Sequence, residues 1–108
     1  MQTINQLAPI KAVIGENRMT LAYFTTTDCN LCKDLFPKVE KMLEDFPLIT
    51  GLRAEADIEP ALVGEYGVFV VPTLILFVEG KETLRRARTI SVPEVAEAVS
   101  RYYGMIYE

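Results

Sequence analysis

The chain has 108 residues, of which 50% are hydrophobic and 24% are charged, a composition typical of a globular domain. This length predicts one domain, spanning residues 1–108, with its own hydrophobic core. The net charge of −4 argues against nucleic acid as a partner, because nucleic-acid-binding domains present basic surfaces. The sequence has no histidine, so the commonest catalytic base and metal ligand is absent.

Hydrophobic spacing predicts the elements of the first half of the chain. In order, these are a short edge strand or irregular segment over residues 1–5, a helix over residues 6–16 that starts near Ala8, a strand over residues 20–26, a helix over residues 29–46 and a strand over residues 48–57. The long helix has the clearest amphipathic pattern. Pro37 lies inside this helix and is expected to kink it.

Turn residues and apolar runs predict the elements of the second half. In order, these are a short helix from Pro60 to Gly67, a buried strand over residues 73–78, a hairpin strand over residues 81–89 and a final helix that opens with the capping box Ser91–Glu94. The final helix is expected to bury Val95, Ala96, Val99, Tyr102 and Tyr103. The arginines of the hairpin strand are interpreted as edge-strand charges that favour solubility; they are Arg85, Arg86 and Arg88.

This order of elements predicts an α/β fold with a mixed central β-sheet flanked by helices on both faces. Strands joined through helices are expected to pair in parallel, and the hairpin adds an antiparallel edge. The N-terminal residues do not read as a secretory signal, and no apolar run approaches the ~20 residues of a membrane-spanning helix. We therefore expect a cytoplasmic protein with no membrane partner, in a compartment that keeps cysteines reduced.

Cys29 and Cys32 are the only cysteines, and they lie between a predicted strand and the long helix. A C-x-x-C pair in this context can exchange a disulfide with another protein. A purely structural disulfide would close a very short loop and constrain the unfolded chain little. One chain cannot supply the roughly four ligands of a zinc site, although two chains could share zinc or an iron–sulfur cluster. Redox chemistry is the favoured interpretation, and a chance C-x-x-C is the remaining alternative.

Several further segments, together with the cysteine pair, resemble the thioredoxin superfamily. They are Pro37, five residues after Cys32; Asp57-Ile58 before the Pro60 helix; Tyr66-Gly67-Val68 followed by Val71-Pro72-Thr73; and the strand from Leu74 to Phe77 followed by Glu79-Gly80-Lys81. The resemblance spans most of the chain, from Met19 to Tyr103, and implies a thioredoxin-like fold. It also implies that the peptide bond before Pro72 is cis and that this proline faces the two cysteines.

The resemblance implies a role for each cysteine. Cys29 is the expected nucleophile, because the free N–H groups at a helix N-terminus favour a thiolate. Cys32, one turn further along, is expected to resolve the mixed disulfide that forms on Cys29. The residues expected to contact the substrate are Val71, through its backbone, Pro72, Thr73, Asp28, Asn30 and Leu31. No cofactor and no metal ion is expected.

The implied function is that of a thiol–disulfide oxidoreductase. The expected enzyme is a protein-disulfide reductase, its working direction left open, that takes part in electron transport and cell redox homeostasis. Its expected partners are proteins that contain disulfides and a reductase or other thiol electron donor, with the chain itself a monomer. Two alternatives stay open: a redox-inactive adaptor or chaperone-like binding module, and a dimer bridged by a metal or iron–sulfur cluster through the C-x-x-C pairs.

Several positions depart from the usual thioredoxin pattern. Asp28 replaces Trp, Asn30-Leu31 replaces Gly-Pro, Val70 and Arg88 replace glycines near the binding surface, Tyr23 replaces a buried Asp, and Arg53 replaces the lysine that accompanies this Asp. In thioredoxins the buried Asp is the usual candidate to take the proton of the second cysteine. A tyrosine with an ordinary pKa of about 10 is a poor substitute. We therefore expect slower resolution by Cys32, or a different reduction potential.

Overall fold

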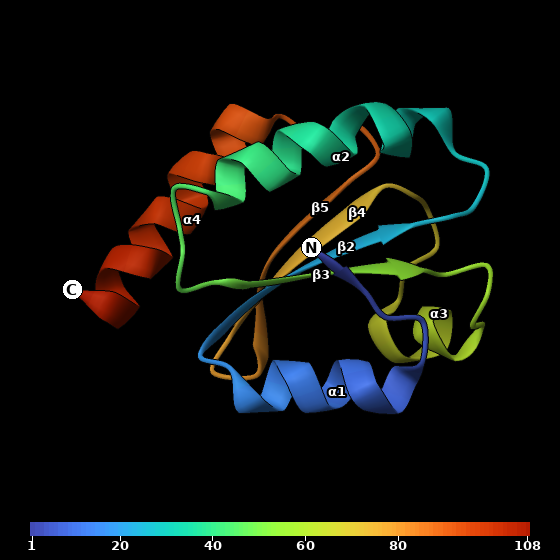
Figure 1. The fold of residues 1–108 in the computed structure, drawn as a ribbon, viewed down its shortest axis with the longest axis horizontal. Helices are drawn as coiled ribbons and strands as arrows, with labels where there is room; N and C mark the ends of the chain where they lie inside the picture. The colour runs from blue at the N-terminus through green and yellow to red at the C-terminus, as the bar shows by residue number, and fades with distance from the viewer.

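A five-stranded β-sheet forms the middle layer of the computed structural model, which describes residues 1–108 (Figure 1). In chain order the elements are β1 (Gln2–Thr3), α1 (Leu7–Glu16), β2 (Met19–Thr25), α2 (Asn30–Leu43), β3 (Thr50–Glu55), α3 (Ala61–Tyr66), β4 (Thr73–Val78), β5 (Lys81–Ala87) and α4 (Val92–Tyr107). Helices α1 and α3 cover one face of the sheet, and α2 and α4 cover the other (Figure 1). The predicted mixed sheet with helices on both faces is confirmed.

The strand order is β1-β3-β2-β4-β5, with β4 antiparallel to both of its neighbours. The expectation that strands joined through helices pair in parallel holds for β1, β2 and β3 but was wrong for β4. The reason is where the connection through α3 leaves the chain. Glu55 at the end of β3 pairs with Thr25, and Thr73 at the start of β4 pairs with Phe24, so both lie at the same end of β2. β4 therefore starts at the end of the sheet where β3 finishes and runs back in the opposite direction.

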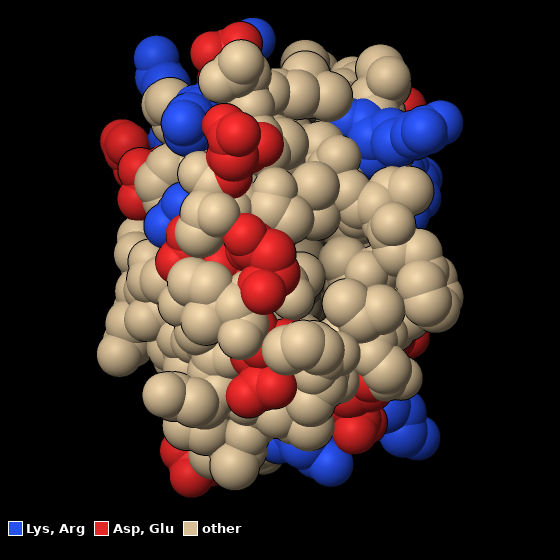
Figure 2. All heavy atoms as spheres, turned by 90° about the vertical axis from the view of Figure 1, so that its right-hand side faces the viewer, with Lys and Arg blue, Asp and Glu red and all other residues tan.

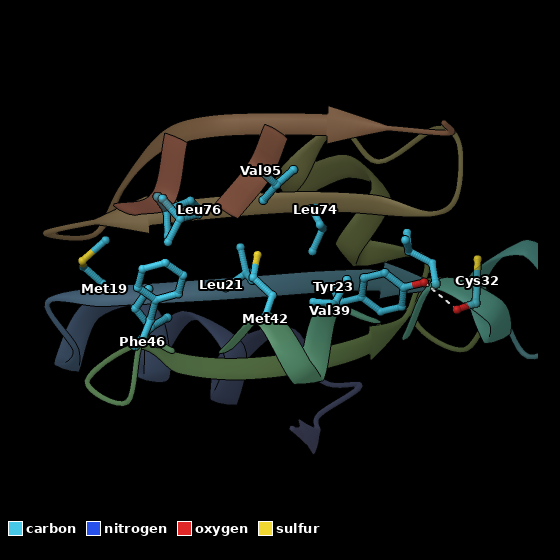
Figure 3. Packing of buried hydrophobic residues seen from close by; sticks show 13 residues of the cluster. Met19, Leu21, Tyr23, Cys32, Val39, Met42, Phe46, Leu74, Leu76 and Val95 are labelled. Atoms are coloured by element: carbon cyan, nitrogen blue, oxygen red, sulfur yellow. Dashed lines mark hydrogen bonds between the residues drawn. The ribbon is translucent and has the colours of Figure 1, made fainter. Parts of the chain in front are cut away.

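The central strand β2 is buried along its whole length, because helices cover both of its faces. Its side chains alternate between the two layers. Leu21 and Tyr23 pack into the cluster that α2 and α4 cover, whereas Ala22 and Phe24 pack beneath α1 and α3. Figure 3 shows Tyr23 and Leu21 close to Val39 of α2. The alternation thus places Tyr23 on the same side of the sheet as the helix that carries the cysteines.

The final helix buries fewer residues than its spacing predicts. Val95 and Val99 are buried as expected, but Ala96, Tyr102 and Tyr103 are only partly buried. The C-terminal part of α4 extends past the edge of the sheet (Figure 1), so its tyrosines are left partly exposed to solvent. None of the four helices combines the length and the apolar character that crossing a membrane requires.

Arg85 on the edge strand β5 does more than favour solubility, which corrects one interpretation of the sequence. Its side chain is half-buried, and its guanidinium donates hydrogen bonds to the backbone carbonyls of Tyr66 and Gly67 at 2.5 and 3.2 Å. It also forms an ion pair with Glu82 at 2.8 Å. Arg85 therefore binds carbonyls that the end of α3 leaves without a helical partner. Arg86 and Arg88 remain exposed.

Two glycines, Gly64 inside α3 and Gly67 directly after it, should respond to replacement by alanine in opposite directions. Gly67 ends the helix with a φ of +64°, a conformation that costs an L-residue about 1 kcal/mol or more. Gly64 lies inside the helix, with open space around the position of a Cβ. Gly67→Ala is expected to lower the free energy of unfolding by about 1 kcal/mol, and Gly64→Ala to raise it by about 0.5–1 kcal/mol. Urea denaturation measures both; equal effects would contradict the assigned conformations.

Candidate functional site

The two cysteines lie where β2 leads into α2. β2 ends at Thr25 and α2 begins at Asn30, so Cys29 is the N-cap residue of the helix and has an extended backbone. Cys32 lies one turn further along and is only 1% exposed, whereas Cys29 is partly exposed. Their Cα atoms are 5.3 Å apart, and their sulfur atoms form a disulfide bond. The structure therefore joins the predicted pair and leaves Cys29 the more exposed residue of the two.

The start of α2 provides a favourable environment for a negative charge on the Cys29 sulfur. The backbone N–H of Cys32 donates a hydrogen bond to Cys29 Sγ over 3.2 Å. The positive end of the helix dipole acts on the same sulfur, and both effects stabilise a thiolate. Two exposed neighbours in sequence, Asp28 and Lys33, carry opposite charges. The geometry of the helix terminus thus suits an anionic sulfur at Cys29.

The Val71–Pro72 peptide bond is cis, and its loop lies at the same end of the sheet as the cysteines. Thr73, the first residue of β4, pairs with Phe24 near the end of β2, which fixes this proximity. The carbonyl of Pro72 accepts a hydrogen bond from the backbone N–H of Arg88 over 2.8 Å. Val71 forms no hydrogen bond through its own backbone N–H or C=O. The loop thus offers a free donor and a free acceptor.

The other residues expected to contact a substrate divide into two groups. Asp28, Asn30 and Leu31 are exposed around the cysteines, as their predicted role requires. Thr73 is buried, and its hydroxyl donates a hydrogen bond to the carbonyl of Val70 over 2.7 Å. The side chain of Thr73 therefore stabilises the cis-proline loop from within and does not face solvent.

An exposed apolar surface next to these loops was missed from the sequence. Phe69 is 82% exposed, and Ile58 and Val70 are also exposed. Phe69 and Val70 line a shallow pocket of about 210 Å³ with Thr26, Ala56, Asp57, Val63, Val68 and Val71. Figure 2 shows this end of the molecule, where a line of acidic side chains crosses a largely uncharged surface. The sequence signal that could have revealed this surface is the pair of adjacent apolar residues Phe69 and Val70, which lie between the predicted helix and strand.

Tyr23 occupies the position below the second cysteine. It is fully buried, and its hydroxyl donates a hydrogen bond to the backbone carbonyl of Cys32 over 2.6 Å (Figure 3). Burial raises the pKa of Tyr23 to about 12, although the charge of Arg53 opposes this rise. The proton of Tyr23 is therefore both engaged in a hydrogen bond and hard to remove. This supports the expectation that Tyr23 cannot serve as a base near neutral pH.

A cavity of about 170 Å³ lies beside the buried cysteine. It is lined by Thr25, Cys32, Lys33, Phe36, Pro37 and Arg53. The guanidinium of Arg53 lies over the ring of Phe36, 5.4 Å from its centre. Two cationic side chains line this cavity, and no carboxylate does.

Thr27, two residues before Cys29, should make the stability of the site depend on pH. It binds the Asp57 carboxylate through its backbone N–H at 3.2 Å and its hydroxyl at 2.6 Å. The hydroxyl bond is the main cause that lowers the pKa of Asp57. The stabilisation is therefore present above the pKa of an unfolded Asp, about 4, and is lost as the pH falls through the lower folded pKa.

Thr27→Val is expected to lower the urea midpoint at neutral pH and to have progressively less effect below about pH 4. Thr26→Val is a matched control, because the side chain of Thr26 makes no hydrogen bond in the structure. Its effect should be the same at every pH. A Thr27→Val effect that does not change between pH 7 and pH 3 would contradict the role assigned to Asp57.

Comparison with known proteins identifies relatives over nearly the whole chain. The family model described as Thioredoxin matches residues 4–100. The thioredoxin-like protein YdfQ of Bacillus subtilis is 30% identical over 105 residues, which cover 97% of this chain and 94% of YdfQ. The thioredoxin of Chlamydia muridarum is 31% identical over 84 residues, which cover 78% of this chain and 82% of that protein.

Solved structures have the same fold at lower sequence identity. The X-ray structure of Fasciola hepatica thioredoxin superimposes with a TM-score of 0.84 at 23% identity, covering 94% of this chain and 98% of that one. The solution structure of oxidised thioredoxin from Plasmodium falciparum gives a TM-score of 0.85 at 13% identity, covering 95% of this chain and 98% of that one. At these identities the likeness concerns the fold alone.

Proposed function

Because these matches show that the chain belongs to the thioredoxin family, we propose that it is a protein-disulfide reductase in which Cys29 is the nucleophile and Cys32 the resolving cysteine. The observation that carries this proposal is the joined pair at the start of α2, in which Cys29 is partly exposed and Cys32 is buried. Only the outer sulfur can reach the disulfide of another protein. The inner sulfur is placed to displace that protein afterwards.

The reaction begins with the reduced pair. The Cys29 thiolate attacks one sulfur of the substrate disulfide, forms a mixed disulfide with it and expels the other substrate sulfur as a thiolate. The hydrogen bond from the Cys32 N–H and the helix dipole support the thiolate that this step needs. The thiolate of Cys32 then attacks Cys29 Sγ, which restores the internal disulfide and releases the reduced substrate.

The cis-proline loop supplies a place for the substrate backbone. An extended segment can pair with the unbonded N–H and C=O of Val71, as in other cases where a strand is added to an open backbone edge. Asp28, Asn30 and Leu31 lie exposed at the mouth of the site. The apolar surface around Phe69 and Val70 would contact the side chains of that segment.

The proposed partners follow from this chemistry. The oxidised pair must be reduced again, which requires a reductase or another thiol that donates electrons. The substrates are disulfide-containing proteins, and the exchange would serve electron transport and redox homeostasis in the cytoplasm. One copy of the chain contains both cysteines and the cis-proline loop, so a monomer is sufficient for the reaction.

The reduction potential of the Cys29–Cys32 couple tests the proposal. The protein is equilibrated in glutathione or dithiothreitol buffers, and its free thiols are counted. A reversible two-electron transition at a reducing potential, together with catalytic reduction of insulin disulfides, is the expected result. A more oxidising transition would reverse the proposed direction and indicate an oxidant or isomerase. Thiols that do not respond to the buffers would replace the proposal with a redox-inactive binding module.

A further inference from the structure

Neither Tyr23 nor the residues that line the cavity beside Cys32 offer a side chain that can take the proton of its buried thiol. Tyr23 donates its own hydroxyl proton to the Cys32 carbonyl, and burial raises the pKa of that hydroxyl. The cavity beside Cys32 has no carboxylate in its lining. Its volume of about 170 Å³ is ample for water molecules, one of which needs about 10–15 Å³. Water is therefore the available acceptor of the proton.

The charged groups that face this cavity come from α2 and β3. Lys33 of α2 is exposed, whereas Arg53 of β3 is partly buried. β2 contributes the uncharged Thr25 to the lining, the uncharged Tyr23 packs with Cys32 in the core, and nothing charged comes from the cis-proline segment before β4. Arg53 is the inner of the two cations, and it is the one that the structure holds in place.

Arg53 has a fixed position and an uncompensated charge. Its guanidinium stacks over Phe36, which lines the same cavity, and donates a hydrogen bond to Thr3 Oγ1 over 3.4 Å. It forms no ion pair with any carboxylate. Its strand position also pairs it with Tyr23 in the sheet. A positive charge without a partner, held beside a buried thiol, favours the ionised form of that thiol.

We propose that Arg53 is a positioning residue for the resolving step, because its charge stabilises the Cys32 thiolate across the cavity in place of a protein base. The inference rests on the proposed exchange reaction and concerns its second half. Cys32 gives its proton to water in the cavity, and its thiolate attacks Cys29 Sγ. The bond between the two cysteines forms as the bond from Cys29 to the substrate breaks, and the substrate sulfur leaves with the electron pair.

The rate of resolution as a function of pH tests this role. A mixed disulfide between Cys29 and thionitrobenzoate is prepared at low pH, and the release of thionitrobenzoate is followed by absorbance after a jump to each pH. In Arg53→Met the thiol should ionise about one pH unit higher, which lowers the thiolate fraction about tenfold at neutral pH. A more basic thiolate is about threefold more nucleophilic, so the net rate should fall about threefold.

The signature of a charge effect is that the two pH profiles cross. At alkaline pH the Cys32 thiol is ionised in the wild type and in the variant alike. Arg53→Met should then be faster than the wild type, because its Cys32 thiolate is the more nucleophilic. Arg53→Lys keeps the charge and should restore most of the wild-type profile. Lys33→Met removes the exposed cation and should shift the profile less, because solvent screens an exposed charge.

Two outcomes would overturn the inference. An Arg53→Met profile that coincides with the wild type would show that the charge does not act on Cys32. Equal slowing at every pH would show that Arg53 only supports the fold. Far-UV circular dichroism and urea denaturation check that each variant is folded. A wild-type protein that releases no thionitrobenzoate at any pH would instead overturn the proposed exchange reaction itself.

Discussion

Replacing Cys29 by alanine is expected to abolish catalytic reduction of disulfides, leaving only the uncatalysed rate of the thiol in the assay. Cys29 is the partly exposed residue of the pair, and the start of α2 stabilises negative charge on its sulfur. Cys32 is 1% exposed and cannot reach the disulfide of another protein without local opening. Turnover of insulin in the presence of dithiothreitol measures the effect.

The matched variant is Cys32→Ala, which keeps the nucleophile and removes the resolving thiol. It should react with a disulfide substrate once and remain bound to it as a mixed disulfide. The adduct is visible by mass spectrometry and disappears on reduction. Full turnover by Cys29→Ala, or a lasting adduct on Cys32 in that variant, would contradict the assigned roles.

Replacing Tyr23 by aspartate is expected to speed the resolving step and to destabilise the fold. A carboxylate below Cys32 can act as the missing base, and general bases typically contribute about 100-fold or more, so a gain of at least about tenfold is expected. Removing a buried aromatic side chain costs about 3–5 kcal/mol of unfolding free energy. Stopped-flow measurement of mixed-disulfide release and urea denaturation report the two effects separately.

Tyr23→Asn distinguishes the effect of the new carboxylate from the effect of the cavity, which both variants create. It removes the same ring and hydrogen bond but introduces no group that can accept a proton at neutral pH. It should lose comparable stability without the gain in rate. Equal release rates in the Asp and Asn variants would show that the absence of a carboxylate does not limit resolution in this chain.

The order and type of the elements could be predicted because most of them have strong periodic patterns. The direction of β4 could not, although the bounds of α3 were predicted closely, because the start of β4 beside the end of β3 is set by pairing with β2, which no local pattern specifies. The role of Arg85 was hidden for a similar reason. Its partners, the carbonyls of Tyr66 and Gly67, are brought close only by tertiary packing.

In the candidate site too, the features that local sequence patterns specify could be predicted, and those set by tertiary structure could not. Cys29 and Cys32 could be found from their spacing and from the strand before them, since a disulfide within one helical turn is a local feature. The cis bond before Pro72 was expected only through the family resemblance. The cavity that joins Arg53 to Cys32 depends on the register of β3 against β2, which no local pattern specifies.

The attachment of the cis-proline loop to the edge of the sheet has a consequence for its dynamics. β5 is an edge strand that pairs with β4 alone, so it can separate from the sheet more easily than the central strands β2, β3 and β4. Arg85 binds the carbonyl of Gly67 just before the loop, and the N–H of Arg88 binds the carbonyl of Pro72 within it. Fraying of β5 therefore releases the loop, and the frequency of this local unfolding sets how long the surface that receives the substrate stays preorganised.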